Sequence, residues 1–150
     1  MPDQRSQRTF EGFCHLDLPK SEWTHQAHLV VCWVALSTRH PAGTVDFLRG
    51  AISRYNLATG GENTSTGGYH ETLTRYFVGA VASLDAATID EVLRAPRCGT
   101  GAPLRHWSRD ALFSRTARSR WVEPDLAPLP WLTPSILHRP QAEYATVLAH

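Results

Sequence analysis

The sequence predicts an all-α protein: one compact bundle of about five helices, followed by a proline-rich C-terminal extension. Apolar residues recur at helical spacing in successive segments, and no segment of convincing length alternates as a β-strand does. The chain has 150 residues, of which 42% are hydrophobic and 19% charged. It is therefore long enough to bury the core of one globular domain, and residues 1–150 are expected to form a single domain.

A buried central helix is predicted to begin near Thr24 and to end near Ser37. Ser21 or Thr24 can cap its first turn, and its body, AHLVVCWVAL, is apolar on nearly every face. The segment RHPAG that follows contains proline and glycine, which end helices. Before the helix, we expect residues 1–9 to be flexible and the FEGFCHLDLP segment to be irregular.

Four further helices are predicted downstream. Their apolar residues recur three and four positions apart. A turn-rich stretch without large apolar residues, TGGENTSTGG (residues 59–68), separates two of them. We expect the helices at residues 44–58, 69–84, 86–96 and 103–114.

From Glu123 onward the composition changes, because the segment EPDLAPLPWLTPSILHRP contains five prolines. Proline-rich chain favours extended conformations over helices. The same stretch carries four large apolar residues, and a solvated tail would leave them exposed to water, which is unfavourable. We therefore expect residues 123–150 to pack on the bundle, anchored by Leu126, Leu129, Trp131 and Leu132.

The charge distribution gives little reason to expect a nucleic acid or a membrane as a partner. The formal net charge is +1, and the arginine-rich segment at residues 105–121 is interrupted by Asp110, which fits a solvated helix face better than a basic patch. The N-terminal residues lack the apolar core of a signal peptide, and no apolar run is long enough to span a bilayer. We expect a soluble, cytoplasmic protein.

Two stretches place histidines at the start of predicted helices: EWTHQAHLVV (residues 22–31) and GGYHETLTRYF (residues 67–77). Short connections favour up-down-up packing, which brings the start of the first helix and the start of the third to the same end of the bundle. We therefore expect four side chains to meet there, beneath the 59–68 loop: His25, His28, His70 and Glu71.

Three imidazoles with an open coordination position suit a divalent transition metal such as Fe, Cu or Zn. Residues three apart share a helix face, and a helix N-terminus favours the neutral imidazole that binds metals. We predict a mononuclear site of His25, His28 and His70, with catalytic Glu71 as an acid/base or an extra ligand. The H-x-x-H spacing is a weak signal by itself, because the chain has eight histidines and such residues often bond to the backbone.

Further side chains around this site can contact a small polar substrate. Asn56 and Thr74 are uncharged hydrogen-bonding groups, and Arg75 can bind a carboxylate through two parallel hydrogen bonds. Aromatic neighbours of the histidines can wall a pocket, although large aromatic residues are more often part of the core. The predicted substrate-binding residues are Trp23, Asn56, Tyr69, Thr74 and Arg75.

Three motifs carry a resemblance to other proteins: W-T-H-x-A-H-L from residue 23, G-Y-H-E-T-L-T from residue 68 and L-F-S-x-x-A-R-x-x-W-V-E-P-D-L from residue 112. They resemble a family of short bacterial proteins without a characterised activity, over about residues 10–130. The resemblance implies that the three histidines and Glu71 belong to the family's pattern. It implies no particular reaction.

The leading functional prediction is a small-molecule metalloenzyme. Aromatic residues around the site favour redox chemistry over hydrolytic or lyase chemistry. Two alternatives stay open. One is a metal-independent lyase, isomerase or hydrolase in which a histidine and Glu71 transfer protons. The other is a non-catalytic binding or interaction module with structural histidines. The oligomeric state stays open as well.

Overall fold

The computed structural model describes residues 1–131 and confirms the all-α prediction, since that range contains seven α-helices and no β-strand. No helix in the described range combines the length and the apolar character needed to cross a bilayer. Three short 3₁₀ helices connect the longer elements: Lys20–Glu22, Pro96–Cys98 and Ala102–Arg105. The α-helices are α1 (Gln4–Cys14), α2 (His25–Leu36), α3 (Pro41–Ala58), α4 (Glu71–Leu84), α5 (Ile89–Arg94), α6 (Arg109–Leu112) and α7 (Arg115–Ser119).

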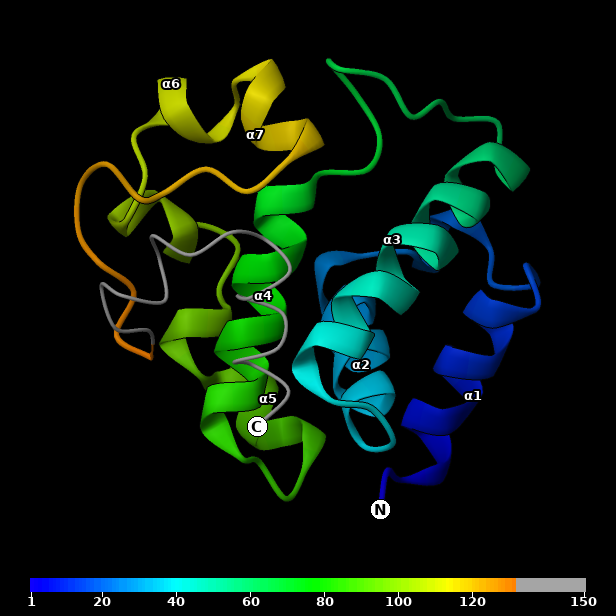
Figure 1. Cartoon of the computed structure of the whole chain (residues 1–150). Helices are drawn as coiled ribbons and strands as arrows, with labels where there is room; N and C mark the ends of the chain where they lie inside the picture. Colours follow the sequence, from blue (N-terminus) through cyan, green and yellow to red (C-terminus); the bar gives the residue numbers. More distant parts are fainter. Residues whose placement is uncertain (132–150) are drawn as a thin grey trace.

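The four long helices alternate in direction, so that α2 and α4 run parallel with their N-termini at the upper end of Figure 1. Residues 59–68 arch over this end, from the last turn of α3 to the first turn of α4. Helix α2 packs against α1, α3, α4 and α5, which explains why its apolar residues face every side. The buried residues of α2 are Ala27, Leu29, Val31, Cys32, Val34 and Ala35.

Helix α1 differs from the expectation that residues 1–9 are flexible and that an irregular segment follows them. The helix begins at Gln4, because the Asp3 carboxylate accepts a hydrogen bond from the Ser6 backbone N–H at 2.8 Å. Phe13, at its last turn, is buried and stacks on Trp23 with ring centroids 4.6 Å apart. Aspartate capping and this aromatic contact hold a segment whose sequence is otherwise polar.

The predicted helix at residues 103–114 is divided into two shorter elements, and a further helix, α7, follows them. Ser108 caps α6 by accepting from the Ala111 N–H, and Ser114 caps α7 by accepting from the Ala117 N–H, each at 3.1 Å. An N-cap residue has an extended backbone, and both serines do, with ψ near 160° (159° and 158°). Ser108 therefore starts a new helix inside the range predicted as one continuous helix, and Ser114 starts α7 where that predicted helix was expected to end.

The proline-rich segment packs on the bundle as far as the structure describes it. Leu129 is buried, and the Trp131 indole lies against Gly79 of α4. Leu126 is exposed, although its backbone N–H donates to the His106 carbonyl at 2.9 Å. The fourth predicted anchor, Leu132, lies outside the described residues, as does the rest of the 132–150 segment.

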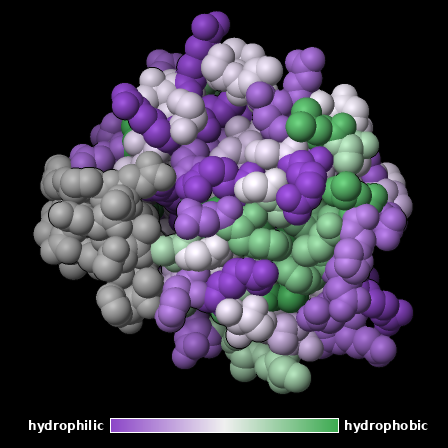
Figure 2. All heavy atoms as spheres, turned by 45° about the vertical axis from the view of Figure 1, so that its right-hand side comes forward, coloured by the Kyte–Doolittle hydropathy of each residue, from purple (hydrophilic) through white to green (hydrophobic). Residues whose placement is uncertain are grey.

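The molecular surface carries a gathering of apolar side chains on one side. Figure 2 shows hydrophobic residues in the middle of the face that it turns forward, with hydrophilic residues around them. Two of the exposed large apolar residues in the described range are Leu16, which follows α1, and Leu57, near the end of α3. The polar border is typical of a protein surface that faces water.

Candidate functional site

A cavity of about 460 Å³ lies between α2, α3 and α4, beside the start of α4. Most of its wall is apolar, formed by residues such as Leu29, Leu48, Ile52, Leu73, Phe77 and Val78. The structure brings most of the predicted site residues to this wall: Trp23, His25, His28, Asn56, Tyr69, His70 and Thr74. Glu71 and Arg75 do not line it.

His25 is the first residue of α2, which Thr24 caps by accepting a hydrogen bond from the Ala27 N–H at 3.2 Å. The His25 Nε2 atom lies 2.8 Å from the Cys98 carbonyl oxygen. A carbonyl oxygen can only accept, so Nε2 carries the hydrogen and the neutral ring keeps a lone pair on Nδ1. The ring also packs edge-on against Phe77, with centroids 5.1 Å apart.

His28 has the opposite tautomer. Its Nδ1 atom lies 2.7 Å from the Thr24 carbonyl oxygen, so Nδ1 carries the hydrogen. The ring stacks on Trp23 with centroids 3.7 Å apart. Within the described residues, no hydrogen bond forms to Nε2, which leaves that lone pair available to a ligand.

The surroundings of His28 favour its neutral form. Burial lowers the pKa of His28 below the usual histidine value, and the neighbouring His25 acts in the same direction. The hydrogen bond to the Thr24 carbonyl opposes both effects without cancelling them. At neutral pH the side chain is therefore an uncharged imidazole with a lone pair on Nε2.

His70 uses both ring nitrogens in the fold. It is the N-cap of α4, where Nδ1 accepts a hydrogen bond from the Leu73 N–H at 3.1 Å. Its Nε2 atom donates to the Leu112 carbonyl at 2.8 Å and so ties α4 to the end of α6. The ring lines the cavity but offers it neither a free hydrogen nor a free lone pair.

The Glu71 carboxylate is buried, with 3% of the residue exposed. Arg49 binds both of its oxygens, through Nε at 2.9 Å and Nη2 at 2.7 Å. The Tyr69 hydroxyl donates to Oε1 at 2.8 Å, and Arg75 Nε donates to Oε2 at 2.7 Å. Burial alone raises the pKa of Glu71, but the hydrogen bonds from Arg49 and Tyr69 and the charge of Arg75 outweigh it and hold the pKa below its usual value.

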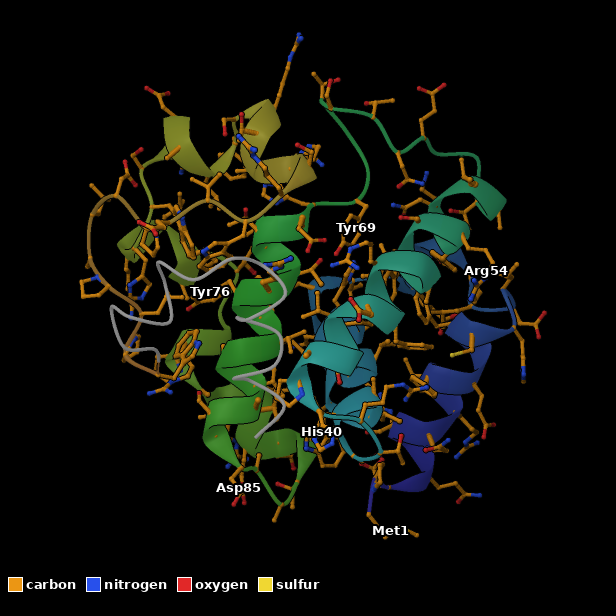
Figure 3. All side chains as sticks on the ribbon, in the orientation of Figure 1. Met1, His40, Arg54, Tyr69, Tyr76 and Asp85 are labelled. Atoms are coloured by element: carbon orange, nitrogen blue, oxygen red, sulfur yellow. The ribbon has the colours of Figure 1, made fainter. Side chains whose placement is uncertain are left out.

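This network changes the roles expected of three residues. Glu71 is held as an anion by four hydrogen bonds, so it has little capacity to exchange a proton. Arg75 is itself buried and binds Glu71 instead of reaching a substrate. Tyr69 lies between α3 and α4 (Figure 3), and its hydroxyl hydrogen is donated to Glu71. Burial, with the Glu71 charge beside it, raises the pKa of Tyr69, which keeps it protonated.

Arg49 is the site residue that sequence reasoning missed. The helical pattern of residues 44–58 places it off the apolar face, and its partner Glu71 lies 22 residues away. Only the packing of α3 against α4 brings the two together, so no local signal could reveal the pair. The same is true of the Cys98 and Leu112 carbonyls that orient His25 and His70, which are 73 and 42 residues from those histidines.

The predicted three-histidine metal site is not assembled in this arrangement. Within residues 1–131, no group of three or more histidine, cysteine, aspartate or glutamate side chains is placed to hold a metal ion. To become a ligand, His70 would have to give up the hydrogen bond that Nδ1 accepts from the Leu73 N–H or the one that Nε2 donates to the Leu112 carbonyl, and Glu71 would have to leave two arginines. The metal site stays a prediction that needs a rearrangement of the fold around His70.

Comparison of the chain with models of protein families, with curated proteins and with solved structures finds no match. The family resemblance of the histidine motifs therefore stays a prediction. An assignment of function rests on the geometry of the cavity and on the chemistry of the groups that line it.

Proposed function

We propose that the protein is a metal-independent enzyme of the proton-transfer type, acting on a small molecule bound in the cavity, with His28 as its general base. The observation that carries this proposal is the state of His28. Its ring is oriented by the Thr24 carbonyl, stacked on Trp23 and left with an unbonded Nε2 at the wall of the cavity. A neutral imidazole held in one orientation is the group that general-base catalysis requires.

The same surroundings accommodate the protonated state during turnover. When Nε2 takes a proton from a C–H or O–H group of the substrate, Nδ1 keeps its hydrogen bond to the Thr24 carbonyl. The face of Trp23 stabilises the resulting imidazolium through a cation–π interaction. The proton then returns to another atom of the substrate or to its leaving group, which describes an isomerase or a lyase.

Glu71 serves this site indirectly. Its carboxylate fixes the Tyr69 hydroxyl at 2.8 Å. Its pair with Arg49 joins α3 to α4, and its pair with Arg75 lies within α4. In this proposal Glu71 is a positioning residue. The metal-independent alternative has a histidine and Glu71 transferring protons together. In this proposal the histidine transfers the proton alone.

Deuterium exchange tests the proposal without knowledge of the natural substrate. Protein treated with a chelator is incubated in D₂O with a panel of small hydroxyketones and phenols, and incorporation of deuterium at carbon is followed by NMR. We expect catalysed exchange that survives chelation and that falls by about 10²–10⁴-fold in His28→Gln, the usual contribution of a general base. The exposed His15 provides the matched control, because His15→Gln removes an imidazole that does not line the cavity.

Three results would count against the proposal: exchange that requires an added metal, exchange that is unchanged in His28→Gln, or no exchange across the panel. The first result would favour the metalloenzyme prediction. In that case the same experiment with His70→Asn, which can still cap α4, would show whether His70 is a ligand.

A further inference from the structure

We infer that the cavity is built for a neutral molecule that presents a hydrogen-bond donor from an apolar body, and that a phenol is the chemical class that fits best. This inference rests on the proposed function, since it concerns the molecule that His28 would face. It follows from the hydrogen-bond partner of each polar side chain at the cavity wall, which determines whether that side chain can still donate a hydrogen bond to a ligand.

The two available imidazoles line the cavity, and each keeps one nitrogen that can accept a hydrogen bond. The ring hydrogen of His25 is donated to the Cys98 carbonyl, and that of His28 to the Thr24 carbonyl. Both acceptors are backbone oxygens that cannot donate, so the assignment does not depend on the choice of tautomer. The nitrogen left over on each neutral ring can only accept.

The two hydroxyl groups at the wall show the same pattern. Tyr69 donates its hydroxyl hydrogen to Glu71 at 2.8 Å, and Thr74 donates its own to the His70 carbonyl at 2.9 Å. Carboxylate and carbonyl oxygens again only accept. Each hydroxyl oxygen therefore keeps lone pairs but no hydrogen for a ligand.

The amide of Asn56 is oriented by a chain of contacts. The Tyr69 backbone N–H can only donate, so the Asn63 atom that it contacts at 3.1 Å is the oxygen. That oxygen also lies 3.0 Å from the Asn56 side chain, which identifies the Asn56 atom as its amide nitrogen Nδ2 and leaves the side-chain oxygen Oδ1 of Asn56 as the unbonded end. Among the side chains at the wall, the donors that remain are the second amide hydrogen of Asn56, the indole N–H of Trp23 and the weakly donating thiol of Cys32.

Charge at the site argues against an ionic ligand. An anion would face a wall in which acceptors predominate, while Arg49 and Arg75 are both bound to Glu71. A cation would find no available carboxylate, because Glu71 already pairs with those two arginines. A neutral ligand avoids both the repulsion from the acceptors and the lack of a charged partner.

Shape and hydrogen-bond strength narrow the class further. The volume of about 460 Å³ lies within the range of about 300–1,000 Å³ that is typical of sites for small molecules. Leu29, Ile52 and Phe77 are among the side chains that form an apolar wall for a ring system. A phenol donates more strongly and accepts more weakly than an aliphatic alcohol, because its oxygen lone pair is delocalised into the ring. It therefore suits a wall rich in acceptors.

Three naphthalene derivatives of similar shape test this inference by isothermal titration calorimetry with the full chain at about pH 7.5, where histidine is mostly neutral. Naphthol carries the donor, methoxynaphthalene lacks it, and naphthoate is an anion. We expect naphthol to bind about tenfold more tightly than methoxynaphthalene, because the ether leaves a buried acceptor unpaired, and naphthoate to bind most weakly.

A variant locates the donor contact. His28→Phe keeps a ring against Trp23 but removes the acceptor, so naphthol should bind it only as tightly as methoxynaphthalene does, while methoxynaphthalene affinity stays the same. Circular dichroism checks that the variant folds, and His25→Phe is a second variant for the neighbouring acceptor. The probe series on the unaltered chain decides the inference even if neither variant folds.

Equal affinity for the three probes, tightest binding of naphthoate, or no binding of any probe would overturn the inference. Equal affinity would still leave a cavity that binds small molecules, as the proposed function requires. Conversely, a preference for naphthol together with no base-catalysed deuterium exchange would keep the ligand class and reject the enzyme. The two experiments can therefore fail separately.

Discussion

At the residue scale, a carbonyl oxygen beside an imidazole nitrogen determines which nitrogen keeps its lone pair. His28 and His70 each donate one ring hydrogen to a backbone carbonyl, but His70 also accepts from the Leu73 N–H. One residue type thus provides a candidate base at the start of α2 and a helix cap at the start of α4. Sequence spacing predicted that the two would share a region, but it could not distinguish their roles, because the Leu112 partner of His70 lies far along the chain.

Stability should depend on pH through the buried histidines. Burial is the main reason that the pKa values of His28 and His70 are lower in the folded state than the usual 6.5. As pH falls below about 7, these two histidines bind protons in the unfolded chain but stay neutral in the folded chain. The free energy of unfolding should therefore fall. The loss ends below the folded pKa values and amounts to about 1.4 kcal/mol per unit of pKa difference.

Urea unfolding at about pH 7.5 and about pH 5.5 measures this effect. His28→Gln should reduce the loss, whereas His15→Gln, at an exposed position, should leave the contribution of His28 in place. A loss on acidification that is as large in His28→Gln as in the unaltered chain would contradict the environment described for His28.

Glu71→Ala should be strongly destabilising. The substitution leaves the guanidinium of Arg75, whose side chain is 3% exposed, without the carboxylate that it contacts at 2.7 Å. Removing one partner of a buried ion pair typically costs about 3–5 kcal/mol. Asp46→Ala is the control, because it removes an Arg49 partner whose side chain is 71% exposed and should cost about 0–1 kcal/mol. Chemical denaturation measures the free energy of unfolding of both variants. Similar losses would show that the Glu71 network contributes less to stability than its burial indicates.

At the element scale, the loop of residues 59–68 is held in place by Asn63 instead of being loosely attached. Its side chain donates to the Ser53 carbonyl at 2.8 Å and accepts from Asn56 and from the Tyr69 N–H. Gly68 allows this arrangement, because its φ is +84° and a Cβ there would lie 2.8 Å from the Asn63 oxygen and closer still to the Glu62 carbonyl. The turn-rich composition predicted a loop, but not that one asparagine joins both of its ends.

Two glycine substitutions separate backbone strain from this close packing. Gly60 also has a positive φ, +88°, but a Cβ there would meet nothing within 4 Å. We expect Gly60→Ala to cost about 1–2 kcal/mol from left-handed strain alone. Gly68→Ala should cost at least about 1 kcal/mol more, because it also displaces the Asn63 hydrogen bonds. Thermal denaturation of both variants checks the difference, and equal losses would contradict the packing of Asn63 on Gly68.

Helices with an apolar pattern and a side-chain cap were predictable within a few residues. Helix α2 begins at the residue after Thr24, as its cap indicates, and α4 ends at Leu84 as expected. Helix α1 was missed because its mean composition is polar, and α6 begins at a serine cap inside an apolar pattern that looks continuous. The apolar pattern thus located the helices that form the cavity and misjudged α1 and α6, whose starts are set by a capping side chain.

At the scale of the whole molecule, successive long helices run in opposite directions, which is why the meeting of the two histidine stretches could be predicted. The connection between α3 and α4 nevertheless spans residues 59–70. The segment after α7 closes the opposite side of α4, where Tyr76 and Trp131 have ring centroids 5.3 Å apart. Figure 3 shows Tyr76 on the side of α4 away from Tyr69. The cavity and the docked C-terminal segment therefore use different faces of the same helix.

Two leucines of that segment measure its contribution to stability. Leu129 is 2% exposed and Leu126 is 60% exposed. We expect Leu129→Ala to cost about 2–5 kcal/mol through lost burial and a residual cavity, and Leu126→Ala to stay within about 0.5 kcal/mol. Urea denaturation provides both values, and a small loss for Leu129→Ala would show that the bundle is stable without the segment.

The measurement that tests the central claim most directly is the protonation state of the His28 ring nitrogens, read from long-range ¹H–¹⁵N NMR spectra recorded across a pH titration. We predict a hydrogen on Nδ1, an unprotonated Nε2 at neutral pH and a pKa below the usual histidine value of about 6.5. A hydrogen on Nε2 of the neutral ring, or a pKa above that value, would contradict the account, because His28 could then not be the general base that this cavity presents.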